Sequence, residues 1–179
     1  MRRAKLGDVY AFKTERGYRI IQWVYHIEKM GRYIKVFPGF YEKEPENLAI
    51  ILQGDCSYIV TYYIPPLLKK GILEFWGNYE EFIVEPFPKY MIGFQKYGNQ
   101  ILFRVANSMR AQDDETYIGD SSGQVIPRKY KDVRLLNLIP STIFFLHMLS
   151  SDFDLKHFDL LWGGEREMET LREKYKDIL

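Results

Sequence analysis

Three runs of strand-forming residues open the chain, and a short turn that ends in glycine separates each from the next. The runs cover residues 8–13, 18–27 and 32–37, and the turns cover residues 14–17 and 28–31. β-Branched and aromatic side chains favour pleated, half-buried strands, and glycine supplies the positive φ that tight turns need. This pattern predicts an antiparallel meander, the usual beginning of a small barrel or a strongly bent sheet.

Strand patterns continue through the first two thirds of the chain. Four further strands are expected, at residues 57–64, 80–85, 91–95 and 100–106, and residues 71–76 form a short apolar segment with a turn behind it. Residues 47–53 suit either a short helix or a strand, and residues 67–70 after Pro65-Pro66 suit a single helical turn.

The longer helical patterns appear near the end of the chain. Pro140-Ser141-Thr142 predicts a helix through about Ser150, and residues 165–178 repeat apolar side chains at helical spacing. The sequence therefore predicts an α+β fold: a bent antiparallel sheet or partly open small β-barrel with C-terminal helices packed on it. We expect one domain over residues 1–179, β-rich over 1–118 and helical over 132–179.

The composition of the chain argues against one class of function and assigns most aromatic residues to the core. The chain has 179 residues and a net charge of +1, which argues against non-specific nucleic-acid binding because such binding needs a basic field. Aromatic residues make up 16% of the chain, and we assign most of them to the core of the sheet.

Cys56 is the only cysteine, so an intramolecular disulfide is excluded and a reducing compartment is favoured. No apolar run follows Arg2-Arg3, and no stretch reaches the ~20 apolar residues that a membrane span needs. We therefore expect a cytoplasmic protein without a signal peptide or membrane contact. The sequence leaves its oligomeric state open.

Residues with catalytic potential are present but scattered. The chain lacks the common nucleotide-binding, zinc and hydrolase motifs. We interpret His147 as a core histidine, Cys56 as a structural thiol, and Asp113-Asp114-Glu115 as a solvated acidic loop rather than a cation site. The prediction is a protein that is not an enzyme and uses no cofactor or metal. A small enzyme with a site assembled around His147 or Cys56 remains an alternative.

A second alternative is an RNA- or peptide-binding β-barrel module. Basic and aromatic residues interleave in the first hairpin, as they do on surfaces that stack bases. These residues are Arg2, Arg3, Lys5, Arg16 and Arg19, with Tyr10, Tyr18 and Trp23.

Two short motifs carry a family resemblance. The first is Lys5-Leu6-Gly7-Asp8-Val9-Tyr10-Ala11-Phe12, followed by Gly17-Tyr18 and a strand ending in Trp23-Val24. The second is Gly71-Ile72-Leu73-Glu74-Phe75-Trp76-Gly77, followed by Pro86. With these motifs the first two thirds of the chain resembles immunity protein family 26 of bacterial polymorphic toxin systems.

The resemblance implies a protein that binds a cognate toxin domain and neutralises it. Acidic loops would steer and occlude a basic toxin cleft, and aromatic side chains would anchor the interface. The expected toxin-binding residues are Glu42, Glu44, Glu46, Asp113, Asp114 and Glu115, with Tyr41, Tyr62, Tyr79 and Tyr117 as anchors.

Overall fold

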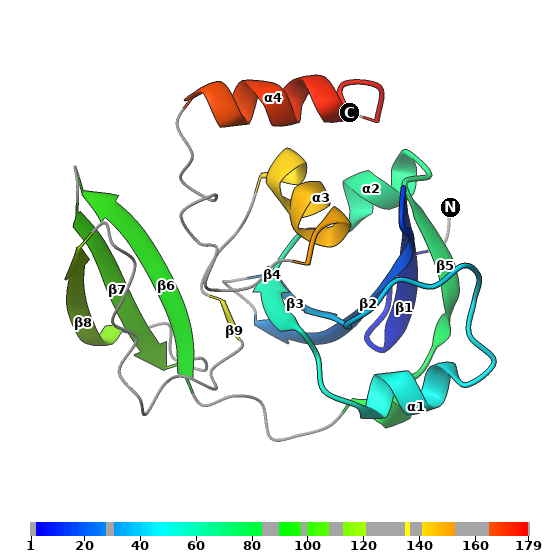
Figure 1. The fold of residues 1–179 in the computed structure, drawn as a ribbon. Helices are drawn as coiled ribbons and strands as arrows, with labels where there is room; N and C mark the ends of the chain where they lie inside the picture. The colour runs from blue at the N-terminus through cyan, green and yellow to red at the C-terminus, as the bar shows by residue number, and fades with distance from the viewer. Residues whose placement is uncertain are drawn as a thin grey trace.

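The computed structural model describes residues 3–27, 31–83, 90–97, 100–107, 113–120, 135–136, 141–152 and 165–178, and side chains within 3–26, 32–83, 141–152 and 169–178. Figure 1 shows the arrangement of the elements. The strands are β1 Asp8–Thr14, β2 Gly17–Ile27, β3 Gly31–Val36, β4 Tyr58–Thr61, β5 Leu73–Asn78, β6 Tyr90–Tyr97, β7 Gln100–Asn107, β8 Asp113–Asp120 and β9 Leu135–Leu136. The helices are α1 Leu48–Gln53, α2 Pro65–Lys69, α3 Thr142–Ser150 and α4 Glu165–Tyr175, with a 3-10 turn η1 at Glu80–Phe82.

The strand order is β5-β1-β2-β3-β4-β9-β6-β7-β8. The first five strands pair antiparallel and form a curved, open sheet, visible in Figure 1. β9 then pairs parallel with both β4 and β6, and β6, β7 and β8 pair antiparallel. The expected α+β fold with a bent antiparallel sheet and later helices is confirmed.

Alternation along the strands produces a core on each face of the sheet, because successive side chains point to opposite sides. In β1, Tyr10 and Phe12 join the core that α3 covers, with Phe145 and Leu146 of that helix. Val9 and Ala11 join the second core, which α1 covers with the residues Leu48 and Leu52. Ser141 caps α3 because its Oγ accepts a hydrogen bond from the Phe144 N–H at 3.3 Å.

The Gly-Asp motif builds the start of β1. Gly7 has a φ of +82°, and its carbonyl accepts a hydrogen bond from the Tyr79 N–H at 3.0 Å. The buried Asp8 carboxylate accepts hydrogen bonds from the Lys5 N–H at 2.7 Å, the Tyr10 hydroxyl at 2.8 Å and the Asn78 amide at 2.9 Å. These bonds join the beginning of β1 to the end of β5.

Two expected elements differ from the structure. Residues 80–82, expected to begin a strand, form η1, because the Phe82 N–H donates to the Tyr79 carbonyl and closes a tight turn. The segment Asp113-Asp114-Glu115, expected to be an acidic loop, lies in β8, which pairs with β7. As the last strand in the sheet order, β8 has one paired side, and its backbone hydrogen bonds do not require an apolar sequence.

No helix within the described residues is long and apolar enough to cross a membrane.

Candidate protein-binding surface

The loop before α1 presents three of the predicted carboxylates to solvent. Tyr41 forms an antiparallel bridge to Tyr18, which holds the beginning of this loop against β2. The following residues turn away from the sheet, and Glu42, Glu44 and Glu46 are exposed. These three side chains are therefore available to a partner, as expected.

α1 adds an apolar side chain next to this loop. The helix buries Leu48 and Leu52 against the sheet, whereas Ile50, on the other side of the helix, is 67% exposed. When a partner covers an apolar side chain of that size and exposure, the apolar surface leaves water and the complex is stabilised.

η1 adds two carboxylates, Glu80 and Glu81, that were not among the expected toxin-binding residues. Gln22 Nε2 donates to the Tyr79 carbonyl at 3.0 Å, and this bond helps to hold the beginning of η1. α1 packs against η1, and Glu80 and Glu81 are exposed. The sequence shows that Glu80 and Glu81 are adjacent and charged, but it does not show where they lie. The pairing of β5 with β1 brings them near α1.

We call this surface the α1–η1 face and define it by Glu42, Glu44, Glu46, Ile50, Glu80 and Glu81. The segments that form it, residues 42–55 and 74–82, hold seven acidic side chains and one basic side chain, Lys43, in a chain whose net charge is +1. Among the side chains that the structure describes, no lysine or arginine pairs with the five glutamates of the face. The face therefore carries a local negative potential that a basic surface would complement.

Tyr41 and Tyr79 are half-buried next to this face. The Tyr41 hydroxyl donates to the Pro38 carbonyl at 3.2 Å, and burial raises the pKa of Tyr41 while the nearby Arg19 lowers it. The Tyr79 ring stacks on Phe82 with 6.0 Å between centroids. Both rings are pre-ordered, which reduces the entropy lost when such side chains contact a partner.

The other predicted anchors and the second acidic set do not join the α1–η1 face. Tyr62 is 6% exposed, stacks on Phe145 at 4.0 Å and donates from its hydroxyl to Thr142 Oγ1 at 2.9 Å, so it is a core residue rather than a surface anchor. Asp113, Asp114, Glu115 and Tyr117 lie in β8, and their side chains lie outside those described.

The basic-aromatic hairpin does not form an open platform. Tyr10 and Trp23 are buried in the core. Arg19 is 3% exposed and donates to four backbone carbonyls, those of Leu149, Phe37, Gly39 and Ser151. These residues therefore stabilise the fold, and the base-stacking surface expected from the hairpin is not present in the described side chains.

The surroundings of His147 and Cys56 do not support a catalytic role for either residue. His147 is half-buried in α3, and burial together with the Lys174 ammonium lowers its pKa. Cys56 is half-buried and packs beside Val24, Tyr33 and Ile59. Within the described part of the chain, no group of three or more His, Cys, Asp or Glu side chains could share a metal ion.

The α1–η1 face is therefore the surface with the clearest chemistry, because it combines exposed carboxylates from two separate segments with one exposed apolar side chain on α1. Comparison of the chain with protein-family models, curated protein sequences and solved structures finds no match.

Proposed function

We propose that this protein is an immunity protein that binds a cognate bacterial toxin domain in the cytoplasm and neutralises it by covering its active site. The observation that carries the proposal is the α1–η1 face, with its five exposed glutamates and the exposed Ile50. The resemblance of the first two thirds of the chain to immunity protein family 26 supports the same function.

The chemistry of the face favours a basic partner. Carboxylates that outnumber the basic side chains around them attract a positively charged cleft over the Debye length, about 10 Å at 0.1 M salt. A toxin that cleaves nucleic acid needs such a cleft to hold phosphates. Because charge complementarity mainly accelerates association, an acidic face would let the immunity protein capture the toxin soon after entry.

Ile50 supplies the apolar part of the contact. Interfaces combine a small, desolvated apolar centre with a polar rim, and the centre carries most of the binding free energy. Ile50 lies in α1, which follows the loop of Glu42, Glu44 and Glu46 and packs against η1. Tyr41 and Tyr79 extend the contact with ordered aromatic rings.

The first experiment is capture of partners from the bacterium that produces the protein. The expected partner is a protein whose C-terminal domain arrests growth when expressed alone and is neutralised by co-expression of this chain. Recovery of nucleic acid instead would favour the RNA-binding alternative. A captured domain that is toxic but is not neutralised would contradict the proposal.

The second experiment tests the face itself. Glu44→Lys with Glu46→Lys should slow association with the captured domain by roughly tenfold or more at low ionic strength, because steering becomes repulsion. The matched control is Glu169→Lys with Asp177→Lys, which changes the same charge on exposed positions of α4 and the residues after it. Equal association rates for the two double variants, measured by stopped flow, would rule out the α1–η1 face.

A further inference from the structure

Arg32, at the beginning of β3, has a different environment from the buried Arg19. Arg19 uses its guanidinium on four carbonyl groups. Arg32 is half-buried and, among the described residues, makes neither a side-chain hydrogen bond nor an ion pair. Its Nη1 is buried without an acceptor among the described residues, which leaves a donor unsatisfied.

Two aromatic rings hold this guanidinium in place. Its central carbon lies 4.0 Å from the Trp23 ring centroid and 5.6 Å from the Tyr63 ring centroid. Trp23 is itself fixed, because its indole N–H donates to the Tyr25 carbonyl at 2.8 Å. Stacking occupies the face of a guanidinium and leaves its in-plane N–H groups to pair with the two oxygens of a carboxylate or phosphate. In Arg32 the edge formed by Nε and Nη2 can do so, because these two atoms, unlike Nη1, are not among the buried atoms that lack a partner.

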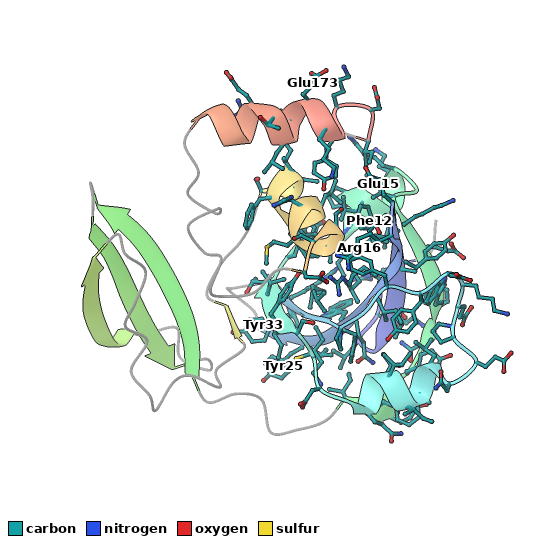
Figure 2. All side chains as sticks on the ribbon, viewed as in Figure 1. Phe12, Glu15, Arg16, Tyr25, Tyr33 and Glu173 are labelled. Carbon is teal, nitrogen blue, oxygen red and sulfur yellow. The ribbon has the colours of Figure 1, made fainter. Side chains whose placement is uncertain are left out.

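The register of the hairpin places a further donor beside Arg32. His26 of β2 pairs directly with Arg32, so the two side chains share one face of the sheet, as Trp23 and Ile34 do. His26 is exposed, and even a neutral imidazole carries one N–H donor. Figure 2 labels Tyr25 and Tyr33, whose stacked rings mark the same end of the hairpin on the opposite face.

Access to the site comes from the surface side. Tyr63 is 63% exposed, whereas Trp23 is buried. A ligand oxyanion can therefore approach beside Tyr63 and meet a guanidinium that is already oriented by Trp23. Among the described residues, no carboxylate pairs with Arg32, so none of them would have to be displaced by a ligand.

We propose that Arg32 and His26, supported by the rings of Trp23 and Tyr63, form a binding site for a ligand oxyanion, a carboxylate or a phosphate group. This site uses residues separate from the α1–η1 face, so it stands independently of the proposed immunity function.

The test is a titration of the full chain with inorganic phosphate and, separately, with acetate, at constant ionic strength with chloride as the reference anion. The indole N–H resonance of Trp23 reports binding in heteronuclear NMR spectra. Saturation by phosphate only assigns a phosphate-bearing ligand, saturation by acetate only assigns a carboxylate, and saturation by both assigns either group. Shifts no larger than those with chloride would overturn the proposal.

Variants connect the signal to the site. Arg32→Gln should raise the dissociation constant by roughly tenfold or more, because it removes the charged, two-pronged donor. Arg172→Gln removes the same charge from an exposed position on α4 and should leave binding unchanged. If Arg32→Gln does not fold, His26→Gln at an exposed position provides the test, with roughly threefold weaker binding expected from loss of one hydrogen bond. Wild-type affinity in every folded variant would overturn the proposal.

Discussion

Gly7 and Asp8 show what the residues behind the family resemblance do in this molecule. Gly7 adopts a left-handed φ and contacts the backbone of η1, and Asp8 is a buried acceptor for donors from three other residues. Both residues therefore maintain the junction of β1, β5 and η1. The motif specifies this junction, whereas the proposed binding chemistry comes from other residues that the junction positions.

Gly7→Ala tests this structural role. A Cβ at Gly7 would lie 2.6 Å from the Glu80 Cα and backbone nitrogen, so we expect a loss of about 2–4 kcal/mol in the free energy of unfolding. Gly71→Ala is the control, because Gly71 also has a positive φ but has no atom within 4 Å of the added Cβ. It should lose only about 1 kcal/mol. Urea unfolding measures both, and equal losses would contradict the close approach to η1.

At the scale of elements, local patterns predicted the meander and both C-terminal helices. Those segments have strong alternation, glycine turns or a capping serine, so neighbouring residues determine their conformation. The predictions for the segments that form η1 and β8 were wrong for the opposite reason. Each depends on a distant segment, η1 on Gly7 and β8 on β7, and no local pattern encodes those contacts.

Arg19 attaches α3 to the sheet, and this attachment gives an element-scale prediction. Its guanidinium joins the carbonyls of Leu149 and Ser151 at the end of α3 to those of Phe37 and Gly39 after β3. Burial lowers the pKa of Arg19, and the Asp152 carboxylate partly opposes that effect. Lysine cannot reach several carbonyls in a planar arrangement, so Arg19→Lys should reduce the free energy of unfolding by about 2–4 kcal/mol.

Arg16→Lys is the matched control for this prediction. Arg16 pairs with the same Asp152 at 2.7 Å, but both side chains are more than half exposed. Such surface pairs contribute about 0–1 kcal/mol. Thermal and urea unfolding of both variants should therefore separate them clearly, and a similar loss would show that Arg19 does not carry the attachment.

For the whole molecule, the strand order decides where the candidate site lies. β5 returns to pair with β1 rather than with β4, its predecessor among the strands. This closure brings η1 to α1, so Glu80 and Glu81 join the glutamates of residues 42–46 on one face. The sequence identified half of this face by its charge. The other half lies on this face because β1 pairs with β5, two segments about 70 residues apart. The entropy cost of closing such a long loop is small enough to allow that pairing, but it does not favour it over other pairings.

His147 connects the stability of the whole molecule to pH. It lies in α3 with its Nδ1 buried and without a hydrogen-bond partner, and Phe144 of the same helix and Lys174 of α4 surround it. Burial, and secondarily the Lys174 charge, lowers the pKa of His147 below its ordinary 6.5. The unfolded chain therefore binds a proton more readily than the folded chain does. This contribution to stability is complete above pH 6.5 and is lost as the pH falls through the lower, folded-state pKa.

We therefore expect the Tm of the wild type to fall between about pH 7.5 and about pH 5.5, and His147→Gln to reduce that fall because glutamine does not titrate. His26→Gln is the control, since His26 is exposed and should follow the wild type. Differential scanning calorimetry at the two pH values measures the change. The same fall in His147→Gln as in the wild type would mean that other groups dominate the acid sensitivity. A reduced fall would identify the protonation of His147 as a main source of the acid sensitivity, because the folded chain disfavours the charged imidazole through burial and the Lys174 charge.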